Sequence, residues 1–196
     1  MRLVLLGPPA AGKGTQASRI TGRFGGMHIA TGDILRDNAE RGTELGRRAQ
    51  ALMERGDLVP DELVISMMLE RVGEVDCAEG FVLDGFPRTV PQAEALDLRL
   101  VELGRPLHVV VGLEIDEDEL RRRLARRAEE QDRAEDEDEE AIRRRLELFA
   151  SETGPLVDYY ARRGLLARVD GAGGVGEVAG RVGAVLAARS GREGAA

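Results

Sequence analysis

The stretch LVLLGPPAAGKGTQ, residues 3–16, decides the fold of this chain. Four apolar residues, Leu3 to Leu6, run without a break into a turn of glycine, proline and alanine. An uninterrupted apolar run is typical of a strand that is buried on both faces of a parallel sheet. A helical pattern follows from about Lys13 to Gly22. The stretch therefore predicts a strand, a glycine-rich turn and a helix.

The turn at residues 7–15 has the features of a phosphate-binding loop. Backbone N–H groups of such a turn and of the helix N-terminus point at an anion. Lys13 is the only lysine among 28 basic residues. Its compact ammonium can reach the β- and γ-phosphates, which the rigid fork of arginine cannot do in the same space. The motif departs from its general form because Gly14 separates Lys13 from Thr15.

Composition limits the class of protein. A chain of 196 residues suits one domain with a sizeable core. Its net charge of −8 argues against binding to nucleic acid, and it has no apolar stretch long enough for a membrane span or a signal peptide. We expect a cytoplasmic protein with no membrane partner. We also expect no zinc, because Cys77, His28 and His108 are too few for a four-ligand site.

Strand and helix patterns alternate along the whole chain, which predicts an α/β fold with a five-stranded parallel sheet flanked by helices. Ligands bind beyond the carboxyl ends of the strands in such folds. The strands are expected at 3–6, 27–30, about 81–84, 107–115 and 165–170. The other helices are expected at about 34–41, 43–55, 61–72, 91–104, after Asp116, around 142–149, and at 175–189.

Candidate N-caps are Thr31 and Asp33, Asp61 and Asp116, whereas Thr43 is expected to begin its helix. Residues 191–196 are small and polar, and they are expected to be disordered.

Six segments together resemble the adenylate kinases and related nucleoside monophosphate kinases. They are GKGTQ at 12–16, TGDILR at 31–36, GDLVPDELV at 56–64, DGFPRTVPQ at 84–92, RLELF at 145–149 and VDGAGGVGEV at 169–178. The resemblance covers about residues 1–189 and follows the order of the family. It implies a P-loop NTPase-type sheet with a small helical insertion and a short lid.

The resemblance implies an ATP:AMP phosphotransferase that makes two ADP, requires Mg²⁺, and serves adenine nucleotide homeostasis and AMP salvage. Its partners would be ATP and AMP or ADP, and the enzyme would be a monomer. Residues 1–190 would form one domain, with a core at 1–29, 60–126 and 138–190. The monophosphate-binding region would be 30–59, and the short lid 127–137.

The resemblance also implies the site residues. The catalytic residues would be Lys13, Arg88, Arg133 and Arg145. The residues that hold ATP would be Ala10, Ala11, Gly12, Lys13, Gly14, Thr15, Arg127 and Gly173. The residues that hold AMP would be Thr31, Arg36, Asp57, Leu58, Val59, Gly85, Phe86, Pro87, Arg88, Gln92, Arg133 and Arg145. Asp84 would orient Mg²⁺ through waters, and the Phe86–Pro87 bond would be cis.

Elementary chemistry favours the same residue types. Two nucleotides bring many negative charges together, so several arginines are needed to neutralise them. Arg88 and Gln92 are four residues apart at a helix start and therefore share a side. The amide of Gln92 can both donate to and accept from an adenine edge. The choice of Arg127 over Arg126 rests on spacing alone, and Arg123 is a further candidate.

Three departures from the family pattern stand out. Ala10 replaces a usual glycine, so the loop is expected to be stiffer or reshaped. The acidic lid segment is one residue longer than the usual short lid. Gly173 stands where a side chain near adenine is common, so only its backbone can contribute.

Three other interpretations stay open. A UMP/CMP kinase has the same outline, although Thr31 and Gln92 favour AMP. A non-catalytic nucleotide sensor is the second, and the intact set of lysine and arginines argues against it. A plain NTPase switch is the third, and the TGDILR and DGFPRT segments argue for a second nucleotide site instead.

Overall fold

The computed structural model describes residues 1–130 and 139–193, with only the backbone described at 127–130 and 190–193. Five parallel strands form one sheet in the order β2-β3-β1-β4-β5. Their bounds are β1 (Arg2–Leu6), β2 (Met27–Ala30), β3 (Phe81–Asp84), β4 (Val109–Glu114) and β5 (Leu166–Asp170). Every expected strand is present, and the predicted fold class is confirmed.

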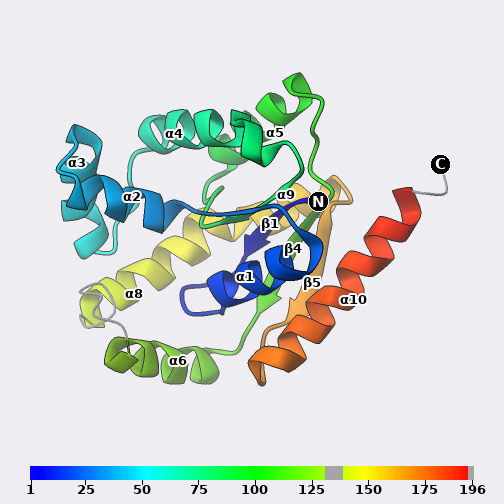
Figure 1. Ribbon diagram of the computed structural model, residues 1–196. Helices are drawn as coiled ribbons and strands as arrows, with labels where there is room; N and C mark the ends of the chain where they lie inside the picture. The colour runs from blue at the N-terminus through cyan, green and yellow to red at the C-terminus, as the bar shows by residue number, and fades with distance from the viewer. Residues whose placement is uncertain (131–138, 194–196) are drawn as a thin grey trace.

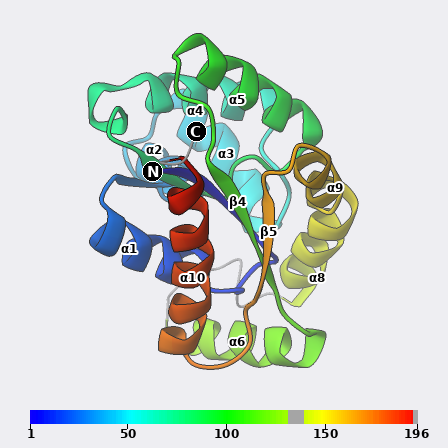
Figure 2. The same cartoon turned by 90° about the vertical axis from the view of Figure 1, so that its right-hand side faces the viewer.

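Helices cover both faces of this sheet (Figures 1 and 2). Helices α1 (Lys13–Phe24) and α10 (Val175–Glu193) pack on one face. On the other face lie α4 (Asp61–Gly73), α5 (Val90–Glu102) and α9 (Pro155–Arg162). Successive residues of β1 point to opposite faces, so Leu3 belongs to the first core and Val4 to the second. Burial on both faces explains why β1 is apolar throughout.

A pair of helices, α2 (Thr31–Glu40) and α3 (Glu44–Glu54), is inserted between β2 and α4 and lies at the left of Figure 1. The backbones of α2 and α3 approach closely at Gly46, where a Cβ would collide with the carbonyl of Asn38. Thr43 was expected to begin this helix, but it is the N-cap of α3 and accepts a 3.0 Å hydrogen bond from the Gly46 amide. This pair is the small helical insertion that the resemblance implies.

Two further helices follow β4 along the chain. They are α6 (Glu117–Glu130) and α8 (Glu139–Leu148), and α8 continues through a π-helical turn at Phe149–Thr153 into α9. A short 3₁₀ turn, Val75–Cys77, follows α4. Asp116 caps α6 through a 2.8 Å bond from the Glu119 amide, as expected. No helix in residues 1–130 and 139–193 is long and apolar enough to cross a membrane.

Several expected boundaries are wrong. Thr31 does not cap a helix that starts at residue 34, because α2 already begins at Thr31 and its N-cap is Ala30. Asp61 is likewise the first helical residue of α4, and its carboxylate bonds elsewhere. Helix α10 runs to Glu193, so residues 191–193 are helical where disorder was expected. Helix α6 runs to Glu130, and the lid expected at 127–137 stays a prediction, because 131–137 lie outside the described residues.

Candidate active site

A cleft of about 1000 Å³ opens at the carboxyl ends of the central strands. The parallel register places Asp84 of β3 beside Leu5 of β1 and Ala30 of β2, so three strand ends deliver their loops to one place. Most of the predicted site residues line it: Ala10, Ala11, Gly12, Lys13, Gly14, Thr15, Thr31, Arg36, Asp57, Leu58, Val59, Asp84, Gly85, Pro87, Arg88, Gln92, Arg145 and Gly173.

Three predicted residues are not among those that line the cleft. Phe86 is 1% exposed and packs in the core beneath its turn, next to a cis bond to Pro87. Arg133 and the side chain of Arg127 lie outside the described part of the chain. Arg126, the alternative to Arg127, does line the cleft. The described geometry therefore supports Arg126 as a candidate that spacing did not select.

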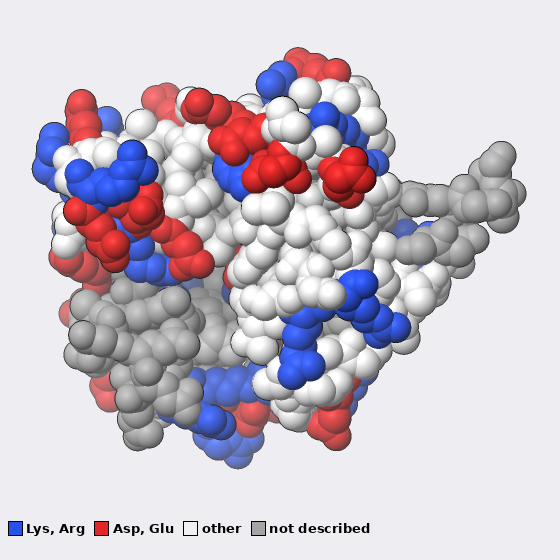
Figure 3. Space-filling model, viewed as in Figure 1, with Lys and Arg blue, Asp and Glu red and all other residues white. Residues whose placement is uncertain are grey.

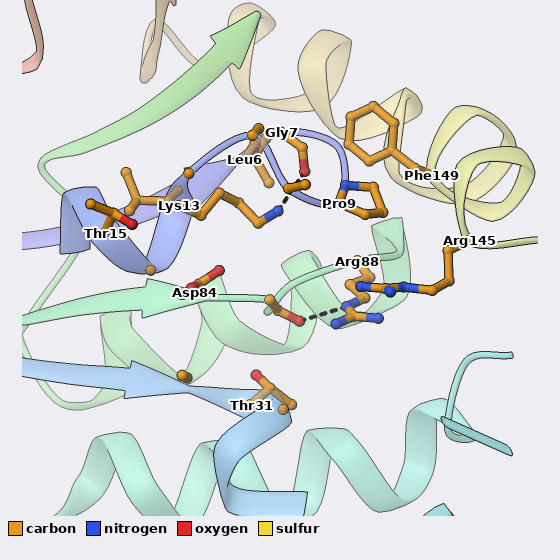
Figure 4. Close-up of a pocket in the computed structure, with 18 of the residues that line it drawn as sticks. Leu6, Gly7, Pro9, Lys13, Thr15, Thr31, Asp84, Arg88, Arg145 and Phe149 are labelled. Carbon is orange, nitrogen blue, oxygen red and sulfur yellow. Dashed lines mark hydrogen bonds between the residues drawn. The ribbon is translucent and has the colours of Figure 1, made fainter. Parts of the chain in front are cut away.

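The loop at 7–15 folds around its own lysine. The ammonium of Lys13 donates to the carbonyls of Gly7 and Pro8, at 2.8 and 2.9 Å (Figure 4). Ala10 has a φ of 59°, a left-handed conformation in which a Cβ costs energy. Alanine therefore adopts here a conformation that glycine takes more readily, and the expected stiffening or change of shape stays a prediction. Residues 10–15 line the cleft, and backbone N–H groups in such a loop can form an anion site.

Asp84 ends β3 in the middle of the cleft, with 17% of its side chain exposed. Nε2 of His28 lies 3.8 Å from Oδ2 of Asp84, too far for a hydrogen bond. Burial opposes ionisation, but His28, Lys13 and Arg88 outweigh it, and the pKa of Asp84 falls below its ordinary value. The residue therefore presents a carboxylate at neutral pH.

That carboxylate suits Mg²⁺, which prefers oxygen ligands and retains several waters. Oδ2 of Asp84 lies close to the backbone of Gly14, where a Cβ would be 3.3 Å away. The hydroxyl of Thr15 is in the same part of the cleft (Figure 4). No group of three or more metal-ligating side chains occurs among the described residues. One carboxylate with substrate phosphates is nevertheless an ordinary magnesium site.

Arg88 and Arg145 lie side by side in the cleft (Figure 4). Nε of Arg88 donates to the Gly85 carbonyl at 3.0 Å, and this bond aims the guanidinium. Although the side chain faces the open cleft, loss of solvation lowers the pKa of Arg88, and repulsion from Arg145 and Arg36 lowers it further. Guanidinium groups that repel one another are stabilised when an anion binds between them. The pair is therefore arranged to receive a phosphate group.

Helix α6 presents further arginines to the loop side of the cleft. Nη2 of Arg123 donates to the carbonyls of Gly171 and Gly173, at 2.9 and 3.2 Å. Its Nε pairs with Glu119 at 2.8 Å. Arg123 thus braces the turn at 171–174, and the contact expected between the Gly173 backbone and ATP stays a prediction. Arg122 lines the same wall, and sequence reasoning did not single it out.

The cleft differs in charge from the protein around it. Among the side chains that the structure describes, Lys13 and six arginines line it against four carboxylates, although the chain has a net charge of −8. On the outer face in Figure 3 acidic and basic atoms are mixed, for example over α2, where Arg41 pairs with Asp37. A cationic interior in an acidic protein focuses its attraction on an anionic ligand that fits the cleft.

Besides Arg122, sequence reasoning missed the part that His28 and Asp61 play in this region. His28 lies at the cleft because β2 pairs with β3, and only that pairing could have revealed it. Asp61 was interpreted as a cap, yet it accepts hydrogen bonds from Thr89 and Gln92. Phe149 was expected only from its helical spacing, and it also lines the cleft.

Comparisons with known proteins agree on one family. A family model described as adenylate kinase matches residues 5–165. The chain is 52% identical to an adenylate kinase of Thermus thermophilus over 184 residues, 94% of this chain and 96% of the relative. It is 50% identical to that of Thermobifida fusca over 97% of this chain and 100% of the relative. It is also 50% identical to one from Stenotrophomonas maltophilia over 93% and 97%.

Proposed function

This chain belongs to the adenylate kinase family and catalyses the reversible transfer of the terminal phosphoryl group of ATP to AMP, and we propose that the two nucleotides lie end to end in the arginine-lined cleft. One observation carries this arrangement. The phosphate loop at 7–15 and the segments at 31–36 and 56–59 line one continuous cavity, with Arg88 and Arg145 among its lining residues.

At the ATP end, residues 10–15 would hold the phosphates through backbone N–H groups. The ammonium of Lys13 would exchange its bonds to the Gly7 and Pro8 carbonyls for phosphate oxygens. Arg127, Arg126 or both would add charge from α6. The Gly173 backbone would lie near the base.

At the AMP end, Thr31, Arg36, the backbone of 57–59, the turn at 85–88 and Gln92 would hold the nucleotide. Arg36 is kept near this end by its 2.5 Å pair with Asp33. The amide of Gln92 would contact the base, and Arg88 the phosphate. Phe86 would act from the core, by supporting the turn.

The chain's main work is positioning and neutralisation of charge, because phosphoryl transfer asks little covalent chemistry of a protein. Lys13, Arg88 and Arg145 surround the place where the acceptor phosphate and the transferred group would meet, and Arg133 would join them. Their fixed charges stabilise negative charge as it shifts between oxygens. Asp84 and Thr15 would hold Mg²⁺, which when bound neutralises the phosphates of ATP.

The finer properties are also proposals. We expect a core at 1–29, 60–126 and 138–190, a monophosphate-binding region at 30–59 and a short lid at 127–137. We expect a monomer that works in the cytoplasm, where its nucleotide substrates are found. Zinc is not expected, since one cysteine and two histidines cannot supply four nitrogen or sulfur ligands. Stoichiometric zinc in the purified protein would contradict this.

The test is phosphoryl transfer from ATP to AMP, CMP, UMP and GMP in parallel, with ATP alone as the blank. AMP should have the highest kcat/KM and should give ADP as the product. If CMP or UMP were used about tenfold faster, the enzyme would be a pyrimidine monophosphate kinase. ATP hydrolysis without any acceptor would instead indicate an NTPase.

A further inference from the structure

The side-chain amide of Gln92 is held at both ends. Its Oε1 accepts a 2.7 Å hydrogen bond from the backbone amide of Arg88. Its Nε2 donates a 2.6 Å hydrogen bond to Oδ1 of Asp61. Gln92 is only 2% exposed, yet it lines the cleft. The group that would meet the base is thus almost immobile.

These two partners also decide which way the amide faces. An amide can turn about its last bond and exchange its oxygen and nitrogen. A backbone N–H only donates, and an ionised carboxylate only accepts. A turned amide would place Oε1 against Asp61 and Nε2 against the Arg88 amide, which are two repulsive contacts. Asp61 and the backbone of Arg88 therefore lock one orientation.

A locked amide can discriminate between purines. After its two protein contacts, Gln92 retains one N–H and one oxygen lone pair. Adenine offers an amino donor at position 6 beside an acceptor at N1, whereas a 6-oxopurine offers an acceptor at position 6 and a donor at N1. The two patterns are reversed, so one fixed amide complements only one of them. A free amide could turn and serve both.

Asp61 makes a second contact, which supports a rival explanation. Its Oδ2 accepts a 2.7 Å hydrogen bond from the hydroxyl of Thr89, the N-cap of α5. Asp61 itself begins α4, so the carboxylate also joins the starts of two helices. A residue that only joins helices would affect stability without changing base preference.

We propose that Asp61 is a positioning residue that orients Gln92 and so makes the enzyme prefer 6-aminopurine over 6-oxopurine monophosphates. The proposal rests on the proposed function, in which Gln92 contacts the base of the acceptor. AMP and IMP are the matched probes, because their bases differ only in the exchange of the 6-amino group for a 6-oxo group and its ring proton.

The experiment compares kcat/KM for AMP and IMP in wild type, Asp61→Ala and Asp61→Asn. In Asp61→Ala a water, which both donates and accepts, replaces the carboxylate, so that only the backbone N–H of Arg88 still opposes rotation of the amide. The IMP-to-AMP ratio should rise at least about fivefold. Asparagine can still offer an oxygen to Nε2 and an N–H to Thr89, so Asp61→Asn should keep a ratio near that of wild type.

Thr89→Val provides the control for the rival explanation. It removes the hydroxyl contact between the helices but leaves the bond between Asp61 and Gln92. It should lower the melting temperature and leave the IMP-to-AMP ratio within about twofold of wild type. Glu62→Gln, an exposed neighbour in the first turn of α4, should change neither quantity.

The possible outcomes distinguish a failure of the role proposed for Asp61 from a failure of the proposed function. If Asp61→Ala lowers both rates by the same factor, Asp61 is a structural clamp and the inference is overturned. If Asp61→Ala does not fold, Asp61→Ser, which is too short to reach Gln92, replaces it under the same criterion. If wild type does not phosphorylate AMP at all, the proposed function fails, whatever the variants do.

Discussion

Arg144 of α8 donates a 3.0 Å hydrogen bond from Nε to Oδ1 of Asp57, in the segment that follows α3. Nε of Arg55 lies 3.4 Å from the other carboxylate oxygen. The bond from Arg144, helped by Arg55 and opposed by burial, holds the pKa of Asp57 below its ordinary value. The backbone of 57–59 is proposed to hold AMP, so this ion pair fixes one wall of the AMP end.

Removal of that pair should weaken AMP binding selectively. We expect Arg144→Gln to raise the KM for AMP about threefold, to leave the KM for ATP unchanged, and to lower the melting temperature slightly, since the pair is partly exposed. Arg143→Gln is the control, because Arg143 pairs with Glu147 within α8. If Arg143→Gln raised the KM for AMP as much as Arg144→Gln does, the ion pair between Arg144 and Asp57 would not be what supports AMP binding.

The stabilisation that the ion pair between Arg144 and Asp57 provides should depend on pH. A carboxylate with a lowered pKa stabilises the fold above its unfolded pKa, and this contribution is lost as the pH falls through the folded value. The difference in melting temperature between wild type and Arg144→Gln should therefore be constant above about pH 5 and shrink below about pH 4. If the difference in melting temperature instead grew as the pH fell, the ion pair would not be stabilised by an ionised Asp57, and the prediction would be wrong.

Lys13 should not tolerate its usual replacement. In Lys13→Arg the planar guanidinium cannot reproduce the two bonds to the loop carbonyls or follow the transferred group, so kcat should fall about 10²–10³-fold. Arg19→Lys makes the reverse exchange at an exposed site on the same helix and should leave kcat unchanged. Retention of most activity in Lys13→Arg would show that the loop does not hold the phosphates as proposed.

Arg88→Ala should damage the use of AMP far more than the binding of ATP. Loss of a charge-assisted phosphate contact costs roughly 2–4 kcal/mol in the transition state, which predicts a fall of about 30-fold or more in kcat/KM for AMP. ATP affinity, measured by calorimetry, should change little. Arg99→Ala removes a partly exposed arginine of α5 that pairs with Glu102, and it provides the baseline. A fall of less than about threefold would exclude the role assigned to Arg88.

Two helical glycines should respond in opposite directions to alanine. At Gly46 a Cβ would collide with the backbone of α2, so Gly46→Ala should destabilise the protein by more than about 2 kcal/mol. A Cβ added at Gly22 would meet no atom within 4 Å outside its own turn of helix, so Gly22→Ala should stabilise the protein by about 0.5–1 kcal/mol. Chemical denaturation of both variants checks the sign, and a Gly46→Ala variant as stable as wild type would contradict the close packing.

Cys77 should be nearly inert in the folded enzyme. Burial, only partly offset by Arg71, raises the pKa of its thiol from 9.0 to about 11. At about pH 8 the folded protein should therefore react with iodoacetamide about a hundredfold more slowly than the urea-unfolded chain. Because the unfolded thiol ionises at about pH 9 and the folded thiol only at about pH 11, the free energy of unfolding should fall as the pH rises through this range and level off above it. Equal alkylation rates would show that the thiol is not buried.

The local elements and the loops of the site were predictable because their signals lie within a few residues. The β1 strand, the 7–15 turn and the Asp116 cap each follow from adjacent residue types, and all three are found. The helix starts at Thr31 and Asp61 were misplaced for a related reason. A polar residue near a helix start can cap it or begin it, and the neighbours in space decide which.

The sequence by itself determined the order of strands and helices, the phosphate loop and the family, because hydrophobic periodicity and turn chemistry are local properties. The tertiary structure alone placed the side chain of Arg126 at the cleft, since the direction in which a helical residue points depends on how its helix packs. The tertiary structure alone shows that a Cβ would collide with backbone at Gly46 but not at Gly22. It also brings Asp61 to Gln92, which is 31 positions away in the sequence. These outcomes depend on the atoms that a distant segment places beside a residue, and no local pattern records them.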